Sequence, residues 1–112
     1  MIYERITLKN KTVVNAATEI MFEVATKRAE RVELLRLDLI RSEGEREFER
    51  LVAGVKRVLK NMRSRRQIQF FVTPESFTEQ TTEIQFLLNK YSDYVNDKEE
   101  PAEGTTYFYI KL

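Results

Sequence analysis

The stretch RVELLRLDLIR, residues 31–41, decides how the rest of the chain is interpreted. Leucine occupies every second position from 35 to 39 and charged residues stand between, which is the pattern of a half-buried strand. A helix is the alternative, because Val32, Leu35 and Leu39 also recur at helical spacing and Glu, Leu and Arg are good helix formers. We predict a strand, since it completes an alternation of strands and helices that the flanking segments support.

The segments on either side of residues 31–41 have clear periodicities. Residues 2–8 alternate between apolar and polar side chains, as a strand does. The stretch from Thr12 to Arg28 repeats apolar side chains at helical spacing, with Asn10 or Thr12 as the predicted N-cap. Gly44 marks a break, and the strongest helical pattern follows it. The apolar stripe of this second helix consists of Phe48, Leu51, Val52, Val55, Leu59 and Met62.

Four further segments complete the chain. We predict a strand over residues 67–72 with Ile68, Phe70 and Val72 on its core side, and a helix from Thr73 or Ser76 to about residue 95. The segment 96–104 is acidic and contains proline and glycine, which indicates a solvated loop. Residues 105–112 alternate again and form the last predicted strand.

The resulting order βαβαβαβ predicts an α/β (α+β) fold, with a four-stranded mixed sheet and three helices in a single domain over residues 1–112. A sheet that has helices on both faces carries strands that are apolar on both sides. The strands of this chain alternate instead, so we expect the helices mainly on one face. The other face is then exposed.

Composition excludes most enzyme mechanisms. The 112 residues include no histidine and no cysteine, so disulfides, thiol nucleophiles, imidazole acid–base chemistry and the usual structural zinc sites are excluded. Nineteen Lys and Arg residues stand against eighteen Asp and Glu residues, a balance of +1 that gives no general attraction for nucleic acid or anionic membrane. We therefore expect a protein that is not an enzyme and uses no cofactor or metal.

The face turned away from the helices is the main candidate site. It interleaves aromatic rings with cations, and aromatic residues and arginine are enriched at protein interfaces. We therefore hypothesise a small non-catalytic binding or regulatory module that self-associates through this exposed sheet face. Its candidate binding residues are Tyr3, Arg5, Arg36, Phe71, Tyr107, Tyr109 and Lys111. The alternative hypothesis is a single-stranded nucleic-acid-binding domain, because bases stack on such rings while phosphates contact the cations. The remaining interpretation is that this face has no binding role and is either solvated or covered by a helix.

The second helix contributes two further features. Its basic end, Arg63, Arg65 and Arg66, could contact phosphates, although cations at a helix C-terminus are also expected from the helix dipole alone. Gly54 lies inside the helix, where glycine costs about 0.5 to 1 kcal/mol relative to alanine. A close approach by another helix, of the same chain or of a second one, would explain this glycine; the alternative is a glycine that the helix tolerates without any such contact.

A third hypothesis is a small carboxylate- or metal-dependent enzyme. Its candidate residues have no diagnostic spacing; they are Glu79, Glu83, Asp93, Asp97, Glu99, Glu100 and Glu103. The charged N-terminus does not resemble a signal peptide, and no apolar run is long enough to span a membrane, so the sequence predicts a cytoplasmic protein without a membrane partner.

Overall fold

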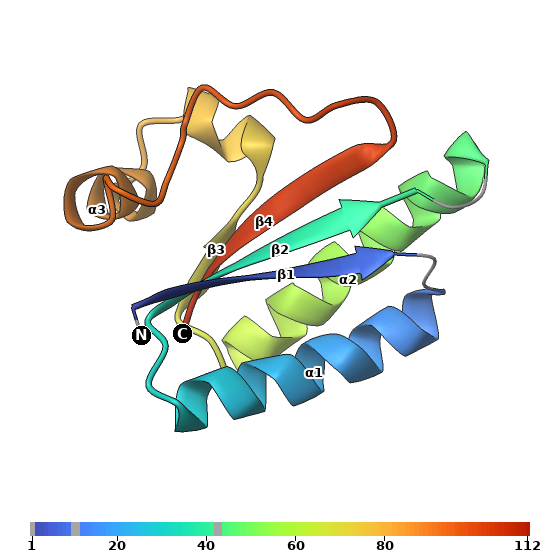
Figure 1. Ribbon diagram of the computed structural model, residues 1–112, viewed down its shortest axis with the longest axis horizontal. Helices are drawn as coiled ribbons and strands as arrows, with labels where there is room; N and C mark the ends of the chain where they lie inside the picture. Colours follow the sequence, from blue (N-terminus) through green and yellow to red (C-terminus); the bar gives the residue numbers. More distant parts are fainter. Residues whose placement is uncertain (1, 10–11, 42–43) are drawn as a thin grey trace.

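The computed structural model describes residues 2–9, 12–41 and 44–112, and within these ranges the chain forms one sheet with helices on both of its sides (Figure 1). In chain order the elements are β1 (Tyr3–Lys9), α1 (Val13–Ala29), β2 (Leu34–Ile40), α2 (Glu45–Ser64), β3 (Phe70–Val72), the 3₁₀ helix η1 (Pro74–Thr78), α3 (Thr82–Lys90) and β4 (Thr105–Lys111). The predicted α+β class, with a four-stranded mixed sheet and three α-helices, is confirmed.

The sheet has the strand order β1-β2-β4-β3. β1 and β2 are parallel, whereas β4 runs antiparallel to both of its neighbours, β2 and β3. The predicted strand within residues 31–41 is therefore confirmed, and it lies inside the sheet. Leu35, Leu37 and Leu39 are fully buried and belong to the core beneath α1 and α2, as the alternation predicts.

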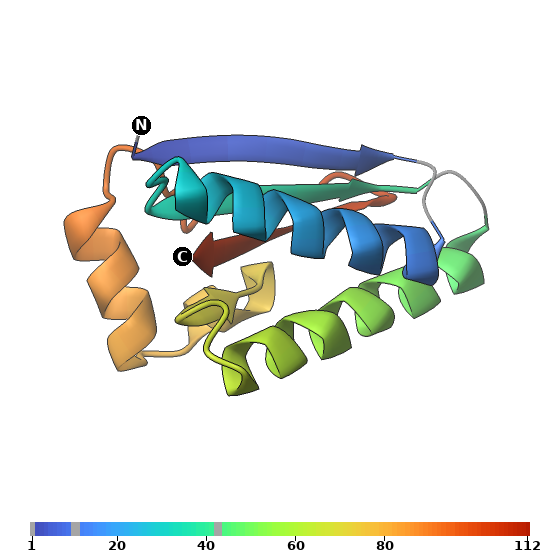
Figure 2. The same ribbon diagram turned by 90° about the horizontal axis from the view of Figure 1, so that it is seen from below.

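Two of the three α-helices lie side by side on one face, as Figure 2 shows from the helix side. α3 lies on the opposite face, at one end of the sheet (Figure 1). The core is correspondingly divided into one cluster between the sheet and α1 and α2, and a second between the sheet and α3. The structure thus places a partial third layer on the face that was expected to be open.

The prediction of a strand over residues 67–72 is wrong in two respects: the observed strand is shorter, and its side chains point to the sides of the sheet opposite to those predicted. Only Phe70–Val72 pair with β4, and Phe70 and Val72 face α3 rather than the core beneath α1 and α2. Phe71 points to the α1 and α2 side, where its ring lies 6.3 Å from that of Phe108. Ile68 is also buried on that side, but it precedes the strand, so the alternation does not run through the whole segment.

α1 begins at a capping residue that the sequence predicts, whereas the predicted third helix is interrupted. The Thr12 hydroxyl accepts a hydrogen bond from the Asn15 amide at 3.2 Å, which caps α1; Asn10, the other predicted cap, lies outside the described residues. The predicted third helix is divided into η1 and α3, because the Thr81 hydroxyl accepts from the Ile84 amide and starts a new helix.

At Gly54, α2 approaches α1 closely. A Cβ atom at this position would lie 2.5 Å from the Cγ1 atom of Val13, so the predicted approach by another helix is confirmed, within the same chain. The buried glycine allows α1 and α2 to pack tightly over the sheet.

Replacing Gly54 by alanine is therefore expected to lower the free energy of unfolding by about 1 kcal/mol, although alanine is the better helix former. The clash with Val13 outweighs the gain in helix propensity. Urea denaturation of the variant measures this loss. In a Val13→Ala background the same substitution should instead stabilise the protein, by about 0.5 to 1 kcal/mol; a loss of equal size in both backgrounds would contradict the assigned contact.

Candidate functional site

The sheet face that was expected to be open is covered, so this expectation is wrong. Tyr107 and Tyr109 are only 1% and 0% exposed, and Arg36 and Lys111 are also buried. The cover consists of η1, α3 and the segment 91–104; Tyr91 and Val95 belong to the core cluster on this face, and Phe77 of η1 packs against it. The rings on which nucleic-acid stacking or self-association would depend are therefore not available at the surface.

The remaining predicted residues of this face are dispersed. Tyr3 is half-buried, and its ring stacks on that of Tyr94 with centroids 5.0 Å apart. Phe71 belongs to the opposite face, because the alternation in β3 differs from the predicted one. Arg5 alone among the predicted residues of this face presents a largely exposed side chain. Burial lowers the pKa of Lys111, whose amino group donates to the carbonyl oxygen of Leu112.

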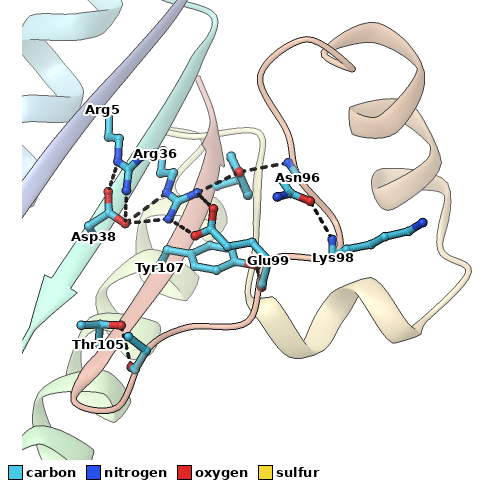
Figure 3. Close-up of polar contacts among 10 residues, drawn as sticks. Arg5, Arg36, Asp38, Asn96, Lys98, Glu99, Thr105 and Tyr107 are labelled. Atoms are coloured by element: carbon cyan, nitrogen blue, oxygen red, sulfur yellow. Dashed lines mark hydrogen bonds and ion pairs between the residues drawn. The ribbon is translucent and has the colours of Figure 1, made fainter.

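Arg36 holds the cover onto the sheet (Figure 3). Its guanidinium group pairs with Glu99 at 2.5 Å and with Asp38 at 2.9 Å, and it donates a further hydrogen bond to the Tyr109 hydroxyl. The same group lies 4.3 Å from the centroid of the Tyr107 ring, a cation–π distance. Glu99 belongs to the acidic loop, so this predicted solvated segment is in fact fastened to β2 and β4.

The charges in this cluster are mutually stabilised. Burial on its own would lower the pKa of Arg36, but the hydrogen bonds with Glu99, Asp38 and Tyr109 outweigh it and raise the pKa above its ordinary value. The hydrogen bond from Arg36 lowers the pKa of Glu99. Burial raises the pKa of Tyr107 to about 12, so its hydroxyl stays protonated and donates to the Glu99 carbonyl oxygen.

A hollow of about 360 Å³ adjoins this cluster, between the ends of β1, β2 and β4 and the loop. Arg5 lines this hollow, and its side chain is largely exposed. Asp38, Glu99 and Glu100 line the hollow as well, and their negative charges would repel an anion. In the described part of the chain no three acidic, histidine or cysteine side chains gather as a metal site would require. The arrangement has the character of a structural ion-pair network, since Asp38 and Glu99 together pair with the Arg36 guanidinium group and the two carboxylates come from different parts of the chain.

The basic end of α2 does not act as one cluster. Arg63 pairs with Glu83 of α3 at 2.6 Å and so joins α2 to the element on the other face. Arg65 and Arg66 are exposed and have left the helix, with Arg66 in the left-handed region at a φ of 60°. Only these two arginines remain available for a partner at this end.

The outer side of α1, which faces away from the sheet, carries several exposed apolar side chains. Val14 is 72% exposed, Phe22 66% and Met21 47%, whereas Ala16, Ile20 and Val24 face the sheet. Two small exposed residues, Thr18 and Ala25, lie between the large ones at helical spacing. We call these five exposed residues the α1 stripe: Val14, Thr18, Met21, Phe22 and Ala25.

A shallow apolar groove of about 230 Å³ runs beside the α1 stripe, between α1 and α2. It is lined by Ala17 and Met21 of α1 and by Val58 and Met62 of α2, together with the polar residues Asn61, Arg65 and Gln67. Stripe and groove together form a continuous apolar surface on the outer side of the two-helix layer. The signal for it in the sequence is the excess of apolar residues in α1, which occur on more of the helix surface than one core-facing stripe needs.

Neither the described helices nor the comparisons identify a wider class for the protein. None of the described helices combines the length and apolar character needed to cross a membrane. No protein-family model, curated protein or solved structure matches the chain.

Proposed function

We propose that the protein is a small non-catalytic binding module that self-associates, and that the contact surface is the α1 stripe. The observation that carries this proposal is the exposure of Val14, Met21 and Phe22 on one side of a single helix. Isolated exposed apolar side chains are ordinary, but a contiguous group of this kind marks an interaction site. Phenylalanine and methionine are moreover residues that protein interfaces favour.

The borders of the α1 stripe favour a second copy of the chain as the partner. On one border, Glu19 and Glu23 lie toward β1, where Lys27 contacts both Glu23 and Glu4. On the other border stands Arg65, and the exposed Arg57 lies on the same side of α2 at helical spacing, whereas Lys56 and Arg63 point to other parts of the molecule. A surface with one acidic and one basic border is complementary to itself, and symmetric dimers require a self-complementary patch.

The same borders disfavour self-association through the free edge of β1. Extending the sheet by a second β1 would bring the acidic borders of the two α1 helices toward each other. Charged residues on an edge strand also oppose such pairing, and β1 carries Glu4, Arg5 and Lys9. The exposed helical layer is therefore the surface that fits a second copy.

Phe22→Asp tests the proposal. The wild-type mass measured by light scattering should rise with concentration from 13.3 kDa toward that of a dimer, whereas the variant should stay monomeric because a carboxylate replaces the largest exposed ring. The helix content of the variant should not change, since Phe22 contributes to neither core cluster.

Gln85→Asp is the matched control, because it adds the same charge to an exposed position of α3 without removing an apolar side chain. It should associate like the wild type. A wild-type protein that remains at the monomer mass at every concentration would refute the proposal, and so would a Phe22→Asp variant that associates as the wild type does.

A further inference from the structure

The orientation of the two copies follows from the positions of the acidic and basic borders. This inference rests on the proposed self-association and adds to it the symmetry of the contact and the groove it uses. Two surfaces that face each other can be related by a two-fold axis along α1 or by one across it. The first makes the two α1 helices parallel, and the second makes them antiparallel.

An axis across α1 places like borders together. Glu19 and Glu23 of one copy would then lie near the same residues of the other, and Arg65 of one copy would lie on the same side of the contact as Arg65 of the other. An axis along α1 exchanges the borders, so that the acidic border of each copy lies against the basic border of the other. Electrostatic complementarity selects between such orientations more strongly than it changes total affinity.

The axis along α1 also matches the shape of the surface. Phe22 stands on the side of the α1 stripe near Glu19, and the groove lies on the side near α2. Because this axis keeps positions along the helix unchanged, Phe22 of one copy comes to the level of the groove beside Met21 of the other. A bulky ring then meets a hollow lined by methionine and valine side chains.

We infer that two copies pack their α1 helices in parallel about a two-fold axis, with Phe22 of each copy seated in the groove between α1 and α2 of the other. Arg65 stands at that groove and therefore lies opposite the border that carries Glu23. The small residues Thr18 and Ala25 occupy the middle of the stripe and face their own counterparts, which allows the two helices to approach closely.

Cysteine cross-linking tests the inference directly, because the natural chain contains no cysteine. A residue that faces its own counterpart can form a disulfide between two copies once it is replaced by cysteine. In the parallel arrangement Thr18→Cys and Ala25→Cys should each give a cross-linked dimer under mild oxidation. In the antiparallel arrangement only a residue at the axis faces its own counterpart. Thr18→Cys and Ala25→Cys therefore cannot both give a cross-linked dimer in that arrangement. Gln85→Cys on α3 is the control and should remain monomeric.

Charge reversal provides the second measurement. Arg65→Glu and Glu23→Arg should each weaken the dimer about tenfold, and the double variant should regain the wild-type dissociation constant. If the wild type dimerises and Phe22→Asp prevents it, but Thr18→Cys and Ala25→Cys do not both cross-link or the double reversal does not recover, the parallel arrangement is wrong while the proposed function stands. A wild type that does not dimerise would refute both.

Discussion

Tyr109→Asp is expected to abolish folding. The Tyr109 ring is fully buried, lies 5.5 Å from the Tyr107 ring and 6.0 Å from the Phe77 ring, and accepts a hydrogen bond from Arg36 at its hydroxyl. Removing a buried aromatic side chain costs about 3 to 5 kcal/mol, and burying a carboxylate adds to this. The sum reaches the total stability of a typical small domain. Circular dichroism should show an unfolded chain.

Tyr109→Phe is the matched control for this prediction. It keeps the ring and loses the hydroxyl contacts with Arg36 and the Asn96 amide, so it should fold and be less stable by about 1 kcal/mol. A Tyr109→Asp variant that folds and merely dissociates would contradict the structure, because it would place the ring at an open interface.

Arg36→Leu is the second substitution with a large expected effect. It removes the guanidinium group, which leaves the Glu99 carboxylate without its cation and the largely buried Asp38 with Arg5 alone. Breaking a buried ion pair from one side destabilises proteins by about 3 to 5 kcal/mol. We expect about 3 kcal/mol here, since Asp38 keeps Arg5 at 2.6 Å and Glu99 is partly exposed. Urea denaturation measures the loss.

Adding Glu99→Leu to Arg36→Leu should return part of this stability, because the second substitution removes the carboxylate that has lost its cation. Glu99→Gln in the wild-type background should cost less than Arg36→Leu, since Arg36 keeps its contacts with Asp38 and Tyr109. If Arg36→Leu lay within about 0.5 kcal/mol of the wild type, the cluster would behave as an exposed ion pair and would not hold the cover in place.

Three of the four strands could be predicted with their facing, because alternation along a strand depends only on neighbouring residues. Leu35, Leu37 and Leu39 show this for β2, as Phe108 and Ile110 do for β4. β3 could not be predicted in the same way. It pairs over three residues only, so the buried Ile68 and the partly buried Phe71 do not share one period.

The cover over the sheet could not be predicted from local patterns. Segment 96–104 carries charges, proline and glycine, which are typical of a solvated loop. The contact that fastens it joins Glu99 to Arg36, 63 positions earlier in the chain, and no short-range pattern reports such a pair. This contact and the packing of Tyr91 and Val95 together bury the aromatic residues that suggested an open binding face.

The sequence alone does not show which apolar residues of α1 face the sheet and which face outward. The reason differs from the one given for the cover. Val14 and Met21 fit the apolar period of the helix as well as Ile20 and Val24 do. Which apolar residues face the sheet depends on where α2 packs, and that is set by the approach at Gly54. The exposed group therefore becomes visible only in the folded chain.

Methyl chemical shifts followed by NMR over a dilution series test the central claim most directly, because they report both whether the chain associates and where. We predict that the methyl resonances of Val14, Met21 and Ala25 move with concentration, together with those of the groove residues Val58 and Met62, while those of Ile84 and Leu87 beneath α3 stay fixed. Shifts that are independent of concentration, or that concentrate near α3 and the covered sheet face, would contradict the account.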